Sequence, residues 1–429
     1  MNRSHIPLLA FALVISNVSA ANWPAWRGAE GTGVSSEKDF PLQWSVTNGV
    51  TNNVKWRVAL PERGNSTPVI WGKRIFVTQA IEKDGRRELF CFDRADGKRL
   101  WQQGVTFTEN ELTHATNPQC SASPVTDGER VIASYGSAGI YCYDMDGKEL
   151  WHRDLGKQTH IWGGAASPVI HGDLCLLNFG PGPNTFLIAL DKRTGKTIWQ
   201  HDESGGHSGE KKASEQGNQW IGSWTTPVVI KVGGREELVM SWPKRVAGFD
   251  LKAGKELWTC AGLNPLVYTS PIHGDGIVVA MGGFGGSDLA VRLGGTGDVT
   301  ATHRLWQHPR NTQRIGSGVV NGGHAYILNE SGVVQCIDIK TGEDKWATEK
   351  PRLTGIGGRS TSWGSMVLAG DRIYVMNKSA DTFVLKANPK FELLALNSLN
   401  EPTESSPAPS DGEIFLRTYK GLWCIGQKK

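Results

Sequence analysis

The chain has 429 residues, more than one compact domain ordinarily needs and enough to bury a large core. Its 53 glycines and 17 tryptophans favour an all-β protein with many turns over a helical one. The formal net charge of +4 and the lack of a dense Lys/Arg run argue against a nucleic-acid partner.

The first twenty residues have the pattern of a signal peptide. Arg3 provides a positive charge, and the apolar run from Leu8 to Ile15 is too short to span a bilayer. Val18-Ser19-Ala20 supplies the small residues that a signal peptidase requires. No later stretch is apolar over the length of a transmembrane helix, and no cysteine precedes Cys91 to carry a lipid. The sequence therefore predicts a periplasmic or secreted protein from which residues 1–20 are removed.

After a leader of residues 21–52, one unit recurs through the rest of the chain. Most copies open with small or polar residues, Pro and an apolar residue, as in Ser66-Thr67-Pro68-Val69. Glycine turns then separate short apolar strands, and a strand with Trp closes the unit, as in Asp96-Gly97-Lys98-Arg99-Leu100-Trp101. Four short strands joined by hairpin turns are typical of a β-propeller blade. Units begin near residues 66, 122, 166, 225, 269, 316, 364 and 405, which predicts an all-β, eight-bladed propeller of four-stranded antiparallel blades.

The last unit has only three recognisable strands before Lys429. Segment 53–58, with Trp56, carries the closing-strand pattern that this unit lacks. We predict that this N-terminal strand completes the last blade, because its pairing would remove an exposed sheet edge. Residues 53–429 are then expected to form one propeller domain.

The chain has seven cysteines, an odd number, and no two of them are spaced as CxxC. Four of them occupy one small-residue position of the repeat, which Ala and Gly fill in other units: Cys91, Cys142, Cys336 and Cys424. Equivalent positions in neighbouring blades lie on sheets about 10 Å apart, beyond disulfide reach. We therefore predict buried free thiols. The repeated Trp is predicted to pack between blades.

Candidate binding residues come from the loops expected around the mouth of the central channel, where closed β folds commonly bind ligands. Trp, Tyr and Arg, which binding surfaces prefer, are frequent in these loops. The alternative is that several of these side chains only cap a wide channel. The candidates are Asn65, Asn117, Trp220, Trp242, Arg314 and Trp363.

No catalytic residue and no metal site is assigned. Segment 201–207 contains two His and two carboxylates, a combination that can bind divalent metals. It lies in a long Gly- and Ser-rich stretch, so we interpret it as a solvated loop.

The unit ending Ala/Cys-x-Asp-x-x-Gly-Lys-x-x-Trp resembles the tryptophan-docking repeat of the pyrroloquinoline-quinone propeller superfamily. Trp23-Pro24-Ala25-Trp26-Arg27-Gly28 resembles the opening of an exported bacterial branch of that family. The superfamily includes quinone-dependent alcohol dehydrogenases and a non-catalytic subunit of the outer-membrane β-barrel assembly machine. This chain lacks the enzymes' adjacent cysteine pair, and their Ca²⁺ ligands are not matched residue by residue.

Two functions follow from this resemblance. The first is a non-catalytic, monomeric binding scaffold of the cell envelope, with a protein partner or polysaccharide at the channel mouth and no assigned cofactor. The second is a pyrroloquinoline-quinone-dependent dehydrogenase that oxidises an alcohol or sugar with atypical ligands and Ca²⁺. In that enzyme, Trp162 or Trp224 would stack on the quinone, and Arg63 or Arg359 would bind its carboxylates.

Overall fold

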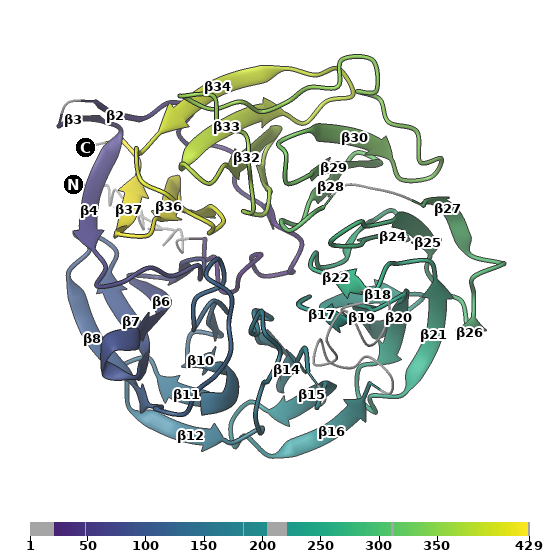
Figure 1. Ribbon diagram of the computed structural model, residues 1–429, viewed down its shortest axis with the longest axis horizontal. Coiled ribbons are helices and arrows are strands. Elements are labelled where there is room, and N and C mark those ends of the chain that lie inside the picture. The colour runs from purple at the N-terminus through teal and green to yellow at the C-terminus, as the bar shows by residue number, and fades with distance from the viewer. Residues whose placement is uncertain (1–20, 48, 183, 204–220, 310–312, 428–429) are drawn as a thin grey trace, which may run out of the picture.

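Short antiparallel sheets arranged in a ring make up nearly all of the chain in the computed structural model (Figure 1). The structure describes residues 21–47, 49–182, 184–203, 221–309 and 313–427. These residues form eight sheets of three or more strands, one two-stranded pair and no α-helix. The predicted all-β propeller fold is confirmed, whereas the predicted signal peptide, 1–20, lies outside the described residues.

Each repeat unit forms one sheet, which we call a blade. Blade 1 has β5 (Val69–Trp71), β6 (Arg74–Ile81), β7 (Arg86–Asp93) and β8 (Arg99–Thr106). Blade 2 has β9 (Val125–Thr126), β10 (Arg130–Ser134), β11 (Ile140–Asp144) and β12 (Glu149–Arg153). Blade 3 has β13 (Val169–His171), β14 (Leu174–Phe179), β15 (Phe186–Asp191) and β16 (Thr197–Asp202). Blade 4 has β18 (Val228–Val232), β19 (Arg235–Trp242), β20 (Arg245–Asp250), β21 (Glu256–Ala261) and the added β26 (Gly297–Asp298).

The second half of the ring departs more from the ideal unit. Blade 5 has β23 (Ile272–Gly274), β24 (Ile277–Met281), β25 (Asp288–Arg292) and β27 (Arg304–His308). Blade 6 has only β28 (Val319–Asn321), β29 (His324–Leu328) and β30 (Val334–Asp338). Blade 7 has β31 (Val367–Ala369), β32 (Arg372–Met376), β33 (Asp381–Lys386) and β34 (Leu393–Ser398), extended by β1 (Val34–Ser35), β2 (Ser45–Thr47) and β3 (Val50–Asn52). Blade 8 has β35 (Ala408–Ser410), β36 (Glu413–Arg417), β37 (Gly421–Ile425) and β4 (Val54–Ala59).

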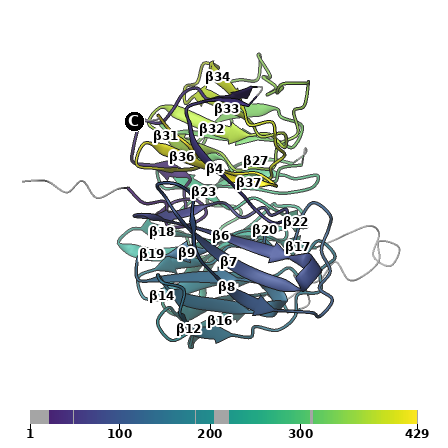
Figure 2. The ribbon, with the colours of Figure 1, turned by 90° about the vertical axis from the view of Figure 1, so that its left-hand side faces the viewer.

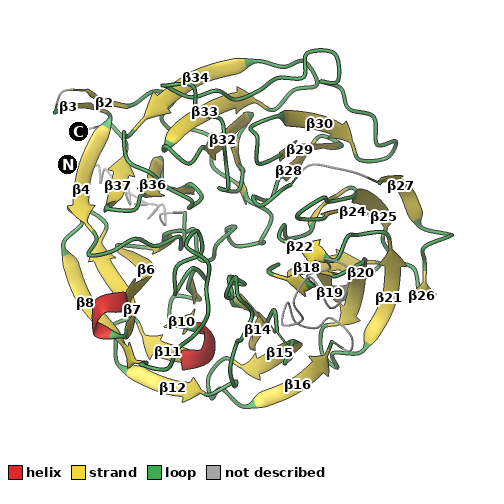
Figure 3. Cartoon of the chain, in the orientation of Figure 1, coloured by secondary structure: helices red, strands yellow, loops and turns green. Residues whose placement is uncertain are grey.

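Three smaller elements complete the described chain. Two 3₁₀ turns, η1 (Glu82–Asp84) and η2 (Gly136–Ala138), lie in loops of blades 1 and 2 (Figure 3). The parallel pair β17 (Gly222–Ser223) and β22 (Leu266–Val267) lies near one face of the disc (Figure 2).

The predicted fourth strand of blade 6 is wrong. Trp346 lies in a turn, because the chain leaves the ladder after a single bridge between Ile337 and Asp344. The Asp344 carboxylate accepts a hydrogen bond from the backbone N–H of Cys336, at 3.3 Å, which caps the sheet edge. Trp346 is still buried, so its side chain packs in the core although its backbone forms no fourth strand.

Hydroxyl residues at the start of each blade form a closed ring around the channel axis. The backbone N–H of each one donates to the hydroxyl oxygen of the next, over 2.8–3.2 Å. The eighth bond, from Ser406 to Thr67, closes the circle. We call these residues the hydroxyl ring: Thr67, Ser123, Ser167, Thr226, Ser270, Ser317, Ser365 and Ser406. They are the polar residues of the sequence motif that opens each unit.

Tryptophan side chains lock neighbouring blades together, as predicted. The indole N–H of Trp151 in blade 2 donates to the backbone carbonyl of Lys192 in blade 3, at 3.0 Å. Its ring covers Gly195, where a Cβ atom would lie 2.6 Å from the ring and where φ is +71°. Glycine is required at such a position because a side chain would both clash and be strained. The same pairing recurs at Trp56, Trp101, Trp199 and Trp306.

The small residue of the third strand lies directly opposite the tryptophan of the fourth. Cys91 pairs with Trp101, Ala189 with Trp199 and Gly248 with Trp258 in the strand register. A larger side chain there would compete with the indole for space. All seven cysteines are buried and free, and burial raises the pKa of Cys91 to about 12, which keeps it a neutral thiol.

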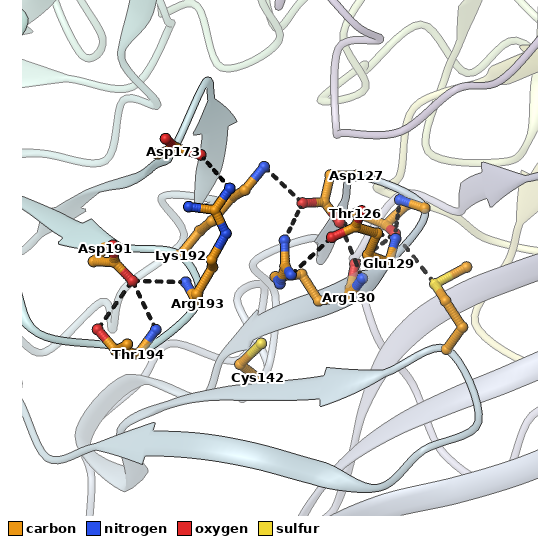
Figure 4. A network of polar contacts seen from close by, with 12 residues as sticks. Thr126, Asp127, Glu129, Arg130, Cys142, Asp173, Asp191, Lys192, Arg193 and Thr194 are labelled. Carbon is orange, nitrogen blue, oxygen red and sulfur yellow. Dashed lines mark hydrogen bonds and ion pairs between the residues drawn. The ribbon is translucent and has the colours of Figure 1, made fainter.

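Ion pairs add to the contacts between blades on the face opposite the channel mouth (Figure 4). Asp127 of blade 2 lies 2.9 Å from the Lys192 ammonium of blade 3 and also pairs with Arg130. The Lys192 pair lowers the pKa of Asp127 against the opposing effect of burial, which is the largest single influence. Arg94 pairs in the same way with Glu413 of blade 8, at 2.8 Å.

The N-terminal strand closes the ring, as predicted. β4 pairs antiparallel with β37, with Trp56 opposite Cys424 and Val58 opposite Leu422. β4 therefore occupies the outer position of blade 8, where the other blades use their own fourth strand.

The leader crosses the end of the channel opposite the mouth, as the purple segment at the centre of Figure 1. Trp23 exchanges two backbone hydrogen bonds with Ile70 of blade 1, and the Pro24 carbonyl accepts one from Thr126 of blade 2. β1 then pairs in parallel with β31 of blade 7. Because it is tied to blades on both sides of the ring, the leader covers this end of the channel.

Candidate functional site

A cavity of about 780 Å³ occupies the open end of the central channel. Loops from all around the ring converge there (Figure 3). Repeat positions contribute two tiers of side chains to its lining. Residues from longer loops complete the lining. The volume lies within the range of small-ligand pockets in proteins.

The lower tier consists of six members of the hydroxyl ring: Thr67, Ser123, Ser167, Thr226, Ser365 and Ser406. Each is more than nine-tenths buried. Each hydroxyl oxygen already accepts a backbone N–H, so its own proton is left to donate. The hydrogen bonds of the described residues provide no acceptor for these protons. In contrast, the preceding hydroxyls of Ser66 and Thr269 donate to backbone carbonyls within their own blades.

The upper tier lies two residues before each member of the hydroxyl ring. Because side chains in extended chain alternate with a period of two, these positions face the channel as the ring does. All eight of them line the cavity: Asn65, Ser121, Ala165, Trp224, Tyr268, Ile315, Trp363 and Glu404. Each blade thus contributes one upper-tier residue, whose type differs between blades. Below it, every blade contributes a Ser or Thr of the hydroxyl ring.

An aromatic cluster forms one side of the cavity. Trp162 and Trp224 have ring centroids 5.8 Å apart, and Tyr268 packs edge-on against Trp224 at 5.1 Å. The Trp224 indole N–H donates to the Gly163 carbonyl at 2.6 Å, which fixes its orientation. His160 packs behind these rings, and burial lowers its pKa to about 4, so the imidazole is neutral at pH 7.

A charged corner forms the opposite side. The buried Glu404 carboxylate lies 2.6 Å from the Arg63 guanidinium and 2.7 Å from the Lys378 ammonium. Lys378 lies over the Trp363 ring at 3.9 Å, and Arg63 over the Tyr419 ring at 4.3 Å. The one carboxylate of the described lining therefore has two cationic partners outside the lining.

Five of the predicted site residues come together at this cavity. They are Asn65, Asn117, Trp162, Trp224 and Trp363. The Asn117 amide donates to the Trp162 carbonyl at 2.6 Å and so holds the neighbouring loop. Arg63 reaches the charged corner but does not line the cavity.

Three other predicted residues lie elsewhere. Trp242 is fully buried among the side chains of blades 3 and 4, because it faces the inside at the end of β19. Arg314 is buried in an ion pair with Asp288 at 2.8 Å, so its guanidinium does not reach the mouth. Arg359 is exposed in the loop before blade 7 and does not line the cavity. Trp220 lies outside the described residues.

Several lining residues escaped the sequence-based prediction. Trp26 lies in the leader, which has no repeat pattern, so no periodic signal pointed to it. Glu404 and Ile315 occupy upper-tier positions and would have been found by counting two residues back from each motif hydroxyl. Phe284 comes from the turn between β24 and β25 and is 63% exposed.

The lining does not fit a pyrroloquinoline quinone. This cofactor carries several carboxylates, which need cationic partners. The described lining contains no Lys or Arg that could pair with several carboxylates at once. Trp162 and Trp224 are tilted by 37° against each other rather than parallel around a flat slot. Among the described residues no group of three or more His, Cys, Asp or Glu is placed to hold a metal ion.

Comparison with protein families gives one match across most of the propeller. The family described as outer membrane protein assembly factor BamB matches residues 43–161, 85–261 and 219–357, which together cover more than half of the chain.

Two individual relatives match over shorter segments. The outer membrane protein assembly factors BamB of Moranella endobia and Alkalilimnicola ehrlichii are 28% and 26% identical over 109 and 141 residues. These segments cover 24% and 33% of this chain but only 27% and 33% of the relatives.

Solved structures share the architecture. The crystal structure of BamB from Moraxella catarrhalis has a TM-score of 0.59 at 14% identity and covers 87% of this chain and 96% of its own. The quinohemoprotein alcohol dehydrogenase from Comamonas testosteroni has a TM-score of 0.66 at 10% identity and covers 95% and 81%. Identities this low establish the fold and no shared activity.

Proposed function

Because the chain belongs to the pyrroloquinoline-quinone-like repeat family described as outer membrane protein assembly factor BamB, we propose that it is a non-catalytic binding scaffold of the cell envelope. The relatives that match individually carry the name of an outer-membrane assembly factor, which favours an exported location and a protein partner. None of the helical segments in the described part of the chain has the length and apolar character needed to cross a membrane.

The observation that carries the proposal is the chemistry of the central cavity. Its aromatic side chains offer large rigid surfaces, a composition typical of binding sites. Two of its polar groups above the floor serve the protein itself: Asn117 holds a loop, and Glu404 balances two cations. The leader crosses the opposite end (Figure 1), and its Trp26 forms part of the lining. Such a site is suited to holding part of a partner.

Photo-crosslinking in cells tests this proposal. A photoreactive phenylalanine analogue at Phe284, which is exposed at the mouth, should produce an adduct with one or a few envelope components. The matched control places the analogue at Ile198, which is 51% exposed on the outer strand of blade 3. Adducts from Phe284 and none from Ile198 would support the proposal. No adduct at Phe284, or the same adducts at both positions, would contradict it.

A further inference from the structure

The floor of the cavity is a set of hydrogen-bond donors. Six members of the hydroxyl ring line one cavity, and the hydroxyl oxygen of each accepts a backbone N–H while its proton is unused by the described residues. Buried polar groups in proteins are ordinarily paired. A ligand that brings several acceptor oxygens to this floor would complete the pairing.

A buried cation lies against the same ring from the leader side. Arg27 is 3% exposed, and its guanidinium donates to the carbonyls of Thr32, Ser317 and Gly318. Ser317 is itself a member of the hydroxyl ring. No carboxylate in the described part of the chain forms an ion pair with Arg27. Its charge is therefore balanced only by backbone dipoles.

A second buried cation lies behind the wall between blades 8 and 1. Arg417 has no exposed surface and donates to the Thr78 carbonyl and the Gln79 side chain, both at 2.7 Å, and to the Ser66 hydroxyl. Ser66 immediately precedes Thr67 of the ring. Arg417, too, forms no ion pair with a carboxylate of the described residues. Two buried cations without a carboxylate partner among the described residues therefore make the surroundings of the floor electropositive.

The charges that face the cavity from other sides do not reverse this sign. Glu404 is more than balanced by Arg63 and Lys378, and the Glu330 carboxylate accepts the Trp363 indole N–H at 3.1 Å. His160 stands behind the aromatic cluster as a neutral imidazole. Above the electropositive floor, the walls are aromatic.

We propose that the central cavity binds a single carboxylate carried on an aromatic or apolar group, with the carboxylate on the hydroxyl ring and the apolar part between the aromatic walls. This inference rests on the proposed function and specifies its ligand. Two sources present the same chemistry: the C-terminal residue of a protein chain and a free small-molecule acid. The hydroxyl donors bind the carboxylate, and Arg27 and Arg417 stabilise its charge without contacting it.

Calorimetry on the purified mature protein with paired probes tests the inference. N-acetyltryptophan represents a chain terminus and indole-3-acetate a free acid, and the corresponding amides match each in shape without the charge. We expect at least one acid to bind about tenfold or more tightly than its amide, since hydrogen bonds to charged groups are the stronger ones. The acid that binds identifies the source. Equal affinity of acid and amide, or tighter binding of a neutral glucose oligomer, would overturn the inference.

A variant pair then places the carboxylate on the ring. Thr226→Val keeps the shape of the side chain but removes the hydroxyl, and we expect it to bring the acid's affinity close to the amide's. Thr226→Ser restores the hydroxyl and should restore the preference. If Thr226→Val fails to fold, as judged by circular dichroism, the comparison of acid and amide in the natural protein still decides. An unchanged preference in folded Thr226→Val would overturn the assignment to the ring.

The two proposals fail in different ways. Crosslinking at Phe284 reports whether a partner occupies the mouth in the envelope. This readout does not depend on whether the floor binds an acid more tightly than its amide. Mouth adducts together with equal affinity for acid and amide would leave the scaffold proposal in place and overturn only the carboxylate inference.

Discussion

Replacing Trp56 by leucine tests how much the N-terminal strand contributes to the closed ring. The substitution removes the indole hydrogen bond to the Arg94 carbonyl, 2.9 Å long, and the ring that covers Gly97. The lost hydrogen bond costs about 1 kcal/mol. Lost contact of a half-buried ring adds about 1–2 kcal/mol. We expect the free energy of unfolding to fall by about 2–3 kcal/mol.

Urea unfolding followed by far-UV circular dichroism measures this loss. Trp151→Leu is the matched comparison, because Trp151 makes the same contacts between two blades inside the repeat array. We expect Trp151→Leu to lower the midpoint somewhat more, since Trp151 is more buried. A midpoint unchanged by Trp56→Leu but lowered by Trp151→Leu would refute the reasoning, because the closing strand would then add nothing to the ring.

Three further predictions concern single positions. Gly195→Ala should lower the melting temperature more than Gly172→Ala. Both glycines have positive φ, but only Gly195 faces an indole ring. Equal effects of the two substitutions in thermal denaturation would count against tryptophan docking. The pKa of His160, lowered to about 4 from 6.5, means that the folded protein resists its protonation. The free energy of unfolding should therefore fall by about 3 kcal/mol as pH drops from 6.5 to 4, and His160→Gln should remove this part of the dependence in urea titrations at each pH. Glu404→Gln leaves two cations beside the cavity without their carboxylate, so it should tighten binding of the acid probes in calorimetry, and weaker binding would contradict the electrostatic argument.

The repeat made the propeller predictable from sequence because each unit repeats its hairpin turns and its tryptophan. The closing role of segment 53–58 followed from the same pattern, and β4 confirms it. The missing strand of blade 6 was not predictable, because the sequence around Trp346 keeps the motif while Asp344 caps the sheet edge in place of a strand.

The candidate site was predicted less well, for a geometric reason. Trp224 and Trp363 line the cavity. Membership of a loop, however, does not distinguish side chains that face the channel from those that face the core. Trp242 ends a strand with its ring turned inward, and Arg314 is drawn away by Asp288. The hydroxyl ring was visible only as a motif, since its circular hydrogen bonding joins residues far apart in sequence.

The sequence alone did not allow the position and contacts of the leader to be predicted. Residues 21–47 have no periodic pattern, and their contacts with blades 1, 2, 6 and 7 depend on the closed ring already being present. Gly318 of blade 6 is one of these contacts, because its carbonyl accepts a hydrogen bond from the Arg27 guanidinium. A Cβ atom at Gly318 would lie 2.2 Å from the Tyr326 carbonyl. This close approach explains why blade 6 has glycine where most other units have proline.

The most direct test of the account is a calorimetric titration of the purified mature protein with pyrroloquinoline quinone and Ca²⁺. The central cavity is proposed to receive part of a partner, and its described lining has no Lys or Arg for the several carboxylates of the quinone and no metal-ligand group for Ca²⁺. We therefore predict no saturable heat at micromolar protein. Saturable binding that disappears in Trp224→Ala, accompanied by quinone-dependent dye reduction, would contradict it.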